Sequence, residues 1–332
     1  MQTKNSDNSV CESKNKNYEE ILTKYIEKSQ KQIDPLLDPR YKRRTMFPIS
    51  CPDIWSLYKM QENAFWTAAE IPFADDVIEW KKLDTDAKKF IKTIIAFFAS
   101  SDSIVAENLV LRFMAEITIP EAIAFYSMQN AMEQIHNEVY SLLVETYAEN
   151  DAEKDQLFKA IETIPIVGKK ADWGKKWISE TDAKGRKIPF AQRLVAFAIV
   201  EGIFFSGSFC GIFWVKEKYN LPALITSNMF ISRDEGLHVQ NACLGYNNYV
   251  INKVPVEIFN QMIKEAVEIE CEFTNYILPY KLKEMNQELM KEYIKFVADR
   301  LAKQLNYEPI YGAKNPFPFM ETSALSSKTN FF

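Results

Sequence analysis

The chain has 332 residues, with 40 Lys and Arg against 45 Asp and Glu, which gives a net charge of −5, and it contains only two His. Its 47% hydrophobic and 26% charged residues are typical of a globular protein and exclude wholesale disorder. The mild acidity offers no basic stripe, so nucleic acid is not an expected partner. Gly (9) and Pro (14) make up about 7% of the chain, against a usual share of about 12%, and this scarcity favours long helices.

Residues 1–33 are rich in Lys, Asn, Ser and Glu and are predicted to form a flexible N-terminal tail, with a nascent helix around Tyr18–Ser29. The first residues lack the apolar core of a secretory signal. The five cysteines form no Cys-x-x-Cys pair, and their odd number fits a reducing, cytoplasmic location better than a disulfide framework. Four prolines in residues 34–52 predict an extended arm that wraps around the fold.

From Asp53 onward, a helical spacing of apolar residues dominates the sequence. Prolines at 120, 222 and 255 stand where helices are expected to begin. Residues 163–189 hold several Gly and Pro residues and are predicted to be a short helix followed by a loop. Helices of about 30 residues span about 45 Å, so residues 34–332 are predicted to form one all-α long-helix bundle rather than two small domains. The predicted helices are Asp53–Ala69, Asp86–Ile117, Glu121–Glu149, Phe190–Lys218, Leu221–Val250, Val256–Met285 and Gln287–Leu305.

Residues 194–215 resemble a membrane span, because these 22 residues carry a single charge and a Gly207-x-x-x-Gly211 motif. That charge, Glu201, lies inside the run, where an unpaired carboxylate in lipid is costly. The sequence has no second comparable run and no clear Lys/Arg asymmetry at the flanks. We therefore expect a helix buried in a bundle and no membrane partner. Glu201 then needs a partner, since buried charges are paired or bind metal.

The two histidines share one local pattern. Glu133 precedes His136 by three residues, and Glu235 precedes His238 by three, both on predicted long helices. Residues i and i+3 share a helix face, so each pair presents a carboxylate and an imidazole to one point. Acids occupy 45 of 332 positions, so chance gives both histidines this neighbour in about 2% of sequences. A single Glu-x-x-His is usually a surface ion pair, whereas two copies that use every histidine indicate a metal site.

A dinuclear carboxylate site in a helical bundle takes one further acid from each of two other helices. Glu201 is one such acid. For the other, Asp102 directly continues the apolar stripe Ile95–Phe98, whereas the alternative, Glu107, is five residues away and cannot face the same site as Asp102. Four carboxylates and two imidazoles suit iron or manganese better than zinc or copper.

Tyr140 follows His136 by four residues and Glu133 by seven, so it lies on the face of the metal ligands. A tyrosine at such a position is usually part of the core. Beside a metal pair that activates oxygen, it is a side chain that can lose an electron and a proton. Phe205 and Phe209, four and eight residues after Glu201, would form an apolar wall that keeps water and reductants away.

These residues lie in stretches that resemble the radical-generating, di-iron small subunit of a class I ribonucleotide reductase of eukaryotic type. The resemblance covers about residues 34–332 and implies a ferritin-like bundle with a di-metal carboxylate site in its core. The matching stretches are FWTAAE (65–70), AFFASSD (96–102), AMEQIHNEVYSLL (131–143), KKADW (169–173), VAFAIVEGIFFSGSF (195–209), SRDEGLH (232–238), FVADRL (296–301) and KTNFF (328–332).

The resemblance also implies the roles of single residues, with two iron ions per chain and manganese as the alternative metal. The implied ligands are Asp102, Glu133 and His136 at one iron, Glu201 and His238 at the other, and Glu235 bridging or shared. The radical would form on Tyr140, in an apolar pocket of Phe205, Phe209 and Ile231. The electron relay would comprise His136, Asp234 and Trp66, with Asp234 as the carboxylate behind a ligand histidine. A core aromatic is the ordinary alternative for Trp66.

By the same resemblance, the metal centre uses O₂ to oxidise Tyr140, and a separate large subunit then reduces ribonucleoside diphosphates to deoxyribonucleotides. The chain has no G-x-x-x-x-G-K-[ST] loop, so substrate chemistry is expected on that partner. A homodimer is also implied. The family continues past the KTNFF-like segment into a tail that docks on the large subunit, and this sequence stops at Phe332, so we expect poor coupling to the partner.

Two other functions stay open on the same bundle. A di-iron oxygenase or desaturase would act on an organic substrate without a large subunit and would not need a redox tyrosine at position 140. An iron-storage or purely structural bundle would bind many irons per chain in a hollow oligomer, or none.

Overall fold

The computed structural model describes residues 4–108, 113–278 and 285–321, with side chains for residues 17–100, 113–278 and 285–321. Within these ranges every named element is helical, and an isolated β-bridge pairs Thr181 with Lys187. The all-α prediction is confirmed. The α-helices are α1 (Lys4–Lys31), α2 (Pro52–Asn63), α3 (Phe73–Lys82), α4 (Thr85–Asn108), α5 (Met114–Glu116), α6 (Pro120–Tyr147), α7 (Asp151–Phe158), α8 (Ala160–Thr163), α9 (Pro165–Ile178), α10 (Phe190–Ile199), α11 (Ser206–Lys216), α12 (Pro222–Tyr249), α13 (Val256–Ile277) and α14 (Gln287–Gln304).

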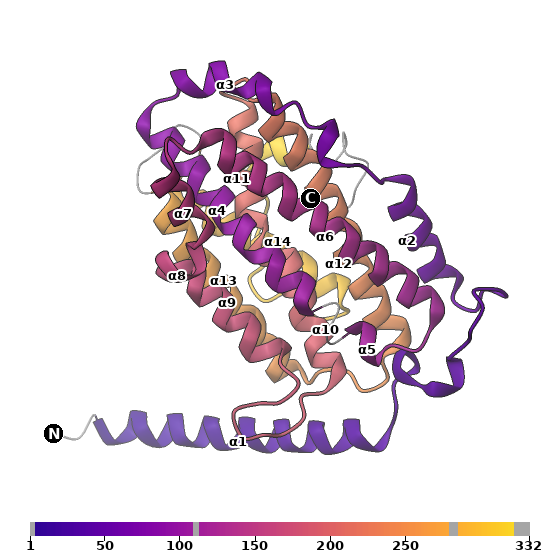
Figure 1. The fold of residues 1–332 in the computed structure, drawn as a ribbon. Coiled ribbons are helices and arrows are strands. Elements are labelled where there is room, and N and C mark those ends of the chain that lie inside the picture. The colour runs from indigo at the N-terminus through magenta and orange to yellow at the C-terminus, as the bar shows by residue number, and fades with distance from the viewer. Residues whose placement is uncertain (1–3, 109–112, 279–284, 322–332) are drawn as a thin grey trace.

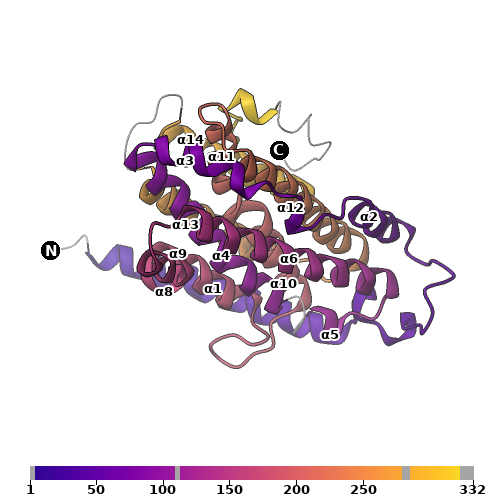
Figure 2. The ribbon, with the colours of Figure 1, turned by 45° about the horizontal axis from the view of Figure 1, so that its top comes forward.

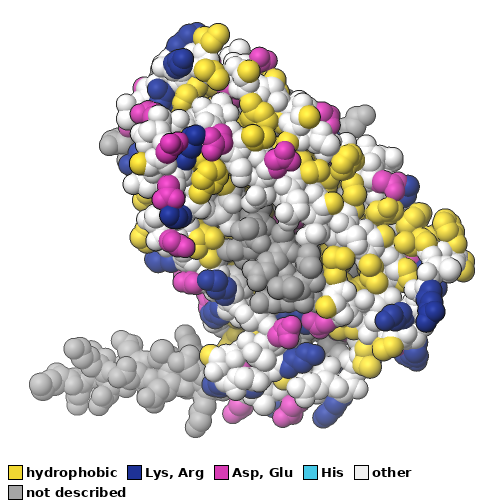
Figure 3. All heavy atoms as spheres, viewed as in Figure 1, with side chains coloured by type: hydrophobic (Ala, Val, Ile, Leu, Met, Phe, Trp, Pro, Cys, Tyr) yellow, Lys and Arg dark blue, Asp and Glu magenta, His cyan; other side chains and the backbone are white. Residues whose placement is uncertain are grey.

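The long helices run side by side as a bundle, and both ribbon views show this arrangement (Figures 1 and 2). Helix α4 packs on α6, α10 packs on α9 and α12, and α13 packs on α9 and α14. Their inward faces form one continuous hydrophobic cluster. In the space-filling view both histidines are hidden, and the visible surface mixes charged and apolar side chains (Figure 3). The middle of this bundle is where α6 and α12 bring together the two Glu-x-x-His pairs.

Proline positions predict helix starts better than the sequence predicts helix ends. Pro120 and Pro222 occupy the first turns of α6 and α12, and Pro255 is the residue just before α13. Within the helix predicted as Asp86–Ile117, the structure describes α4 up to Asn108 and α5 from Met114, and the helix predicted to reach Met285 ends at Ile277. Pro279 stands two residues after Ile277 in the sequence and marks this end, which the prediction overlooked. The prediction for residues 53–69 is also too long, because a capping box at Thr67 starts a separate 3₁₀ turn, η3 (Ala68–Glu70).

The apolar run is a buried helix with a break in its middle. It comprises α10, a π-helical turn η5 (Val200–Phe204) and α11, where one regular helix is predicted. Among the described residues, this is the helix long and apolar enough to cross a membrane, and 94% of its most apolar window is buried inside the molecule. That burial agrees with the expected core helix. The π turn is a surprise, and such turns occur frequently at functional sites.

The N-terminal segment, predicted to be a flexible tail with a short helix, is helical over most of its length. Helix α1 covers most of residues 1–33 and includes the expected short helix Tyr18–Ser29. Tyr25 and Ile26 are buried, and Glu19 pairs with Arg186 at 3.1 Å. Figure 1 shows α1 crossing one end of the bundle, with its first residues extending beyond the other helices. Its flexibility stays a prediction.

Residues 34–52 form the arm expected from their prolines, with two short 3₁₀ turns, η1 (Pro35–Leu37) and η2 (Pro39–Tyr41). The arm is tied to the start of α6 through Glu121. This buried carboxylate pairs with Arg43 at 2.8 Å and accepts from the backbone amides of Ser50 and Cys51 at 2.6 and 3.3 Å. The arm therefore packs against the helix that carries Glu133 and His136.

Candidate metal centre

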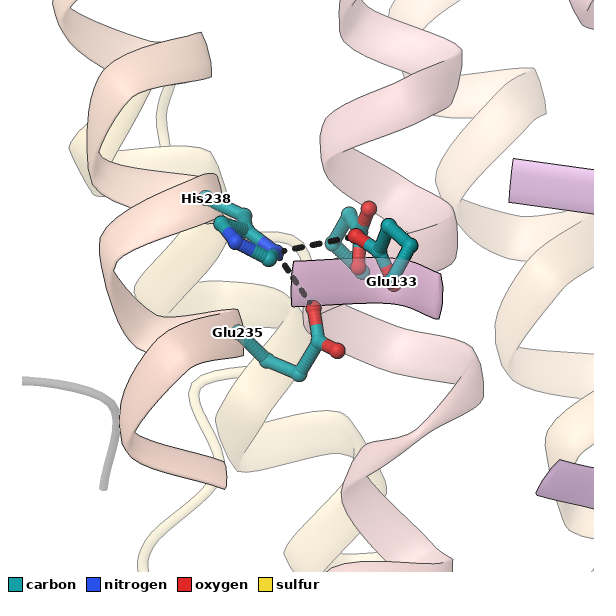
Figure 4. A group of neighbouring side chains, drawn as sticks. Glu133, Glu235 and His238 are labelled. Carbon is teal, nitrogen blue, oxygen red and sulfur yellow. Dashed lines mark hydrogen bonds and ion pairs between the residues drawn. The ribbon is translucent and has the colours of Figure 1, made fainter. Parts of the chain in front are cut away.

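Four buried side chains from three separate elements converge in the middle of the bundle. One ligand atom from each of these residues lies within 4.8 Å of those of the other three. Figure 4 shows three of them, with His238 directed toward both Glu133 and Glu235. The four are Glu133 on α6, Glu201 on η5, and Glu235 and His238 on α12.

The two glutamates of the Glu-x-x-His motifs lie between the two imidazoles. Nδ1 of His238 is 2.9 Å from Glu235 Oε2 and 3.1 Å from Glu133 Oε1. Nδ1 of His136 is 3.1 Å from Glu235 Oε1 and 3.5 Å from Glu133 Oε2. Glu235 thus lies within 3.1 Å of both imidazoles, and the bridging or shared role that the resemblance implies for it stays a prediction. Glu133 also approaches both imidazoles, whereas the resemblance implies that it binds metal on the His136 side alone.

A glutamine that was not among the predicted site residues joins this cluster. Nε2 of the buried Gln129 donates to Glu133 Oε1 and to Glu201 Oε1, both at 3.3 Å. Gln129 lies one turn before Glu133 on α6, so its helical spacing could have drawn attention to it. The amide holds the carboxylates of α6 and η5 together.

The cluster has the ligand atoms of a metal site, and several of them are buried polar atoms without a hydrogen-bond partner among the described residues. Glu133 Oε2, His136 Nδ1 and Glu235 Oε1 are buried, and no hydrogen-bond partner in good geometry is found for them among the described residues. Buried polar atoms normally have such partners, and buried carboxylates need a cation. Carboxylates with imidazoles suit iron or manganese, so the residues present fit the predicted pair of ions.

The pKa values of the histidines reflect the same concentration of negative charge. Burial lowers the pKa of His238, but the carboxylates of Glu235 and Glu133 outweigh it and raise this pKa to about 9. Burial likewise opposes the charged form of His136, yet Asp234, Glu133 and Glu235 raise its pKa well above 6.5. The site therefore favours positive charge strongly, as a cation site should.

The fourth predicted carboxylate, Asp102, belongs to α4, but its side chain lies outside the described residues, as does that of its alternative, Glu107. Its role stays a prediction.

Tyr140 is buried one turn beyond His136 and is packed against an aromatic group. Its ring stacks on Phe98, with centroids 4.6 Å apart and an interplanar angle of 9°. Phe98 in turn contacts Phe209 at 4.9 Å and Phe205 at 5.6 Å between centroids. The two predicted wall residues are thus brought to the tyrosine through Phe98, which was not predicted as part of the pocket. The third, Ile231, is buried on α12, four residues before Glu235.

A series of contacts links the cluster to a tryptophan. Asp234 Oδ2 lies 3.1 Å from His136 Nε2 and accepts from Trp66 Nε1 at 2.7 Å. The Trp66 and His136 rings are also stacked, with centroids 5.9 Å apart. Arg233 holds the other carboxylate oxygen at 3.1 Å and donates to the carbonyl of Ala64 at 2.6 Å. The three residues predicted as a relay are therefore in direct contact.

Comparisons with known proteins agree with this site. Residues 43–316 match the family model for the ribonucleotide reductase small chain. The ribonucleoside-diphosphate reductase small chain of Trypanosoma brucei brucei is 50% identical over 299 residues, which is 90% of this chain and 87% of that protein. A ribonucleoside-diphosphate reductase small chain of Arabidopsis thaliana is 52% identical over 299 residues, which is 90% of this chain and 86% of that protein.

Solved structures show the same fold. The ribonucleotide reductase Rnr4 homodimer from Saccharomyces cerevisiae superposes with a TM-score of 0.80 at 33% identity, covering 97% of this chain and 99% of that chain. The ribonucleotide reductase R2 subunit from Clostridium botulinum has a TM-score of 0.76 at 24% identity, over 85% of this chain and 91% of its own, and supports the fold alone. The ferritin-like bundle predicted from the sequence is thereby confirmed. With its family model matched over residues 43–316 and both Glu-x-x-His pairs joined in one core, this chain belongs to the ribonucleotide reductase small-chain family.

Proposed function

We propose that this chain is the radical-generating subunit of a ribonucleoside-diphosphate reductase and that its radical forms on Tyr140. The observation that carries the proposal is the unbroken series of contacts from the buried carboxylate–histidine cluster through Asp234 to Trp66. A carboxylate behind a ligand histidine is common to metal sites, so the contact that distinguishes this proposal from an oxygenase or a storage protein is the extension to Trp66. Family membership and the names of the relatives support the same activity.

Two iron ions, or manganese in their place, would be held by Glu133, Glu201, Glu235, His136 and His238, with Asp102 as the sixth ligand. When bound, the ions would supply O₂ activation and the oxidising power for removing one electron from a phenol. Asp234 accepts from Nε2 of His136, and this hydrogen bond leaves Nδ1 directed at the shared glutamates and available to a metal. Gln129 holds two of the carboxylates in the absence of metal.

Tyr140 would lose an electron and its phenol proton and would then have to persist as a radical. Its stacking on Phe98, backed by Phe205 and Phe209, keeps water and reductants from the ring. The oxidising equivalent would leave through His136, Asp234 and Trp66. The hydrogen bond from Trp66 to the Asp234 carboxylate gives the indole proton an acceptor during oxidation.

The proposal includes a separate large subunit, which would bind and reduce the ribonucleotides. It also includes a homodimer, for which the support is the dimeric yeast relative. We place the protein in the cytoplasm, where the described cysteines Cys51, Cys210, Cys243 and Cys271, all free thiols, would stay reduced.

The test is to add Fe(II) and O₂ to metal-free protein and to record the EPR spectrum and the tyrosyl absorbance. We expect two irons per chain and a radical signal that Tyr140→Phe abolishes without changing the fold. Tyr126→Phe is the matched control, because Tyr126 is a buried tyrosine on the same helix that is not part of the metal cluster. A radical of wild-type size in Tyr140→Phe would overturn the assignment.

A further inference from the structure

The break in the central helix lies next to the metal centre. The π-helical turn η5 carries Glu201 and ends at Phe204, and α11 begins two residues later at Ser206. A π turn inserts one residue into a helix and interrupts the regular backbone hydrogen bonds at its ends. The direction of Glu201 therefore depends on what holds this break in place.

A buried lysine holds the near side of the break. Lys170 on α9 has a side chain only 3% exposed, and its Nζ donates to the carbonyl oxygen of Phe204 at 2.9 Å. The same ammonium lies 3.7 Å from the ring centroids of both Phe97 and Phe273. These contacts fix a positive charge against the last residue of η5.

A buried glutamate holds the far side. Glu270 on α13 is fully buried, and its Oε2 pairs with Lys170 Nζ at 2.5 Å. Its Oε1 reaches the backbone of α11 at Gly207, so closely that a Cβ at this position would lie 2.7 Å away. Burial raises the pKa of Glu270 to about 7, against the opposing effects of Lys170 and of the Gly207 amide. One ion pair thus touches the helix on both sides of Phe205.

We propose that Lys170 and Glu270 form a clamp that fixes the break between η5 and α11 and thereby positions Glu201 in the metal centre. The inference rests on the proposed function, because the position of Glu201 matters only if the cluster binds metal. Buried ion pairs seldom add net stability compared with apolar side chains of similar size, so stability alone is a poor reason for this pair. Both residues are positioning residues, since they act on the metal through the helix.

The test replaces the whole pair, so that no unpaired charge is left in the core. We compare Lys170→Met/Glu270→Leu with wild type by anaerobic titration of metal-free protein with Mn(II), following free Mn(II) by EPR. We expect Mn(II) affinity to fall by about 10- to 100-fold, the usual loss when groups behind metal ligands are removed. The matched control is Lys169→Met/Glu272→Leu, which removes an exposed ion pair between the same two helices and should leave affinity within about twofold of wild type.

A second pair of variants decides the matter if the double variant does not fold. Gly207→Ala pushes a methyl group against Glu270 Oε1 and leaves both charges present, so it should also weaken Mn(II) binding. Gly211→Ala, one turn further along α11, meets Phe90 at 2.9 Å and Ile94 at 3.0 Å instead, and should disturb packing without weakening Mn(II) binding. Unchanged affinity in folded Lys170→Met/Glu270→Leu, or in Gly207→Ala, overturns the clamp. If wild type itself bound no Mn(II) or Fe(II), the proposed function would be wrong, and this outcome is distinct from a failure of the clamp.

Discussion

Asp234 is the residue whose replacement tests the site most sharply, because one carboxylate serves both the metal centre and the relay. Its Oδ2 receives Trp66 Nε1 at 2.7 Å and faces His136 Nε2 at 3.1 Å, while Oδ1 faces the Arg233 guanidinium. In Asp234→Asn the amide oxygen can keep the first two contacts, but the amide nitrogen then faces a guanidinium that can only donate. The variant keeps the shape of the side chain and removes its charge.

The size of the effect follows from these contacts. Hydrogen bonds to a charged group contribute about 1.5–3 kcal/mol and neutral ones about 0.5–1.5 kcal/mol, so each of the two retained bonds loses about 1 kcal/mol. The expected total of about 2 kcal/mol corresponds to about 30-fold in an equilibrium constant. The bond to His136 orients this side chain and makes its Nδ1 a better ligand, so we expect its share, about 1 kcal/mol or about 5-fold, to appear as weaker metal binding. The share of the Trp66 bond should appear as lower stability of the metal-free fold.

The assay is an anaerobic Mn(II) titration together with thermal unfolding of the metal-free protein. Asp299→Asn is the control, since Asp299 is also buried but accepts from the backbone amides of Ile310, Tyr311 and Ala313. It should lower the melting temperature and leave Mn(II) affinity unchanged. The reasoning would be refuted by wild-type affinity in Asp234→Asn, or by an equal loss of affinity in both variants.

Three further outcomes are expected. Phe98→Ala removes the ring that stacks on Tyr140 and should lower the free energy of unfolding by about 3–5 kcal/mol. It should also shorten the lifetime of the EPR signal, and a radical as long-lived as in wild type would contradict the shielding role of Phe98. Burial raises the pKa of Glu121, but Arg43 and the amides of Ser50 and Cys51 outweigh it and hold this pKa below 4.5. The ionised Glu121 therefore stabilises the fold fully above pH 4.5, and this stabilisation is lost as pH falls through the folded-state pKa. The melting temperatures of wild type and Glu121→Gln should therefore differ at pH 7 and converge below pH 4.5, and a constant difference would argue against the ion pair. Mn(II) at 100 times its dissociation constant should stabilise the fold by about 2.7 kcal/mol per site, measured by denaturant unfolding, with EDTA reversing the effect; no stabilisation would mean that the cluster binds no metal.

The fold could be predicted from the sequence because long helices depend mainly on local features. Few turn-forming residues, apolar spacing and prolines at helix starts predicted α6, α12 and α13 with first residues correct to within two positions. The helix α3 was not predicted, although it buries Asp76 and Trp80. Asp76 accepts from the first amides of α12, so the role of α3 depends on a contact about 150 residues away. Such a contact leaves no periodic signal in the sequence.

The site was predictable to the extent that its residues have unusual neighbours. Both histidines follow a glutamate by three residues, and Glu201 is the single charge in an apolar run. The shared position of Glu133 depends on how α6 and α12 are rotated toward each other, which helical periodicity does not specify. The stacking of Phe98 on Tyr140 depends in the same way on the packing of α4 against α6.

The clamp illustrates why burial has to be seen before a charged pair can be interpreted. Lys169 and Lys170 are adjacent on α9, and each pairs with a glutamate of α13, Glu272 and Glu270 respectively. In the sequence the two pairs are equivalent. In the fold the first pair is about half exposed and so contributes little, whereas the second is 3% and 0% exposed and lies against the break in the central helix. The two double replacements share their chemistry and their helices and differ in burial and in contact with η5. If only the buried pair affects Mn(II) binding, then what governs the metal centre is the contact with η5, and not the presence of an ion pair between α9 and α13.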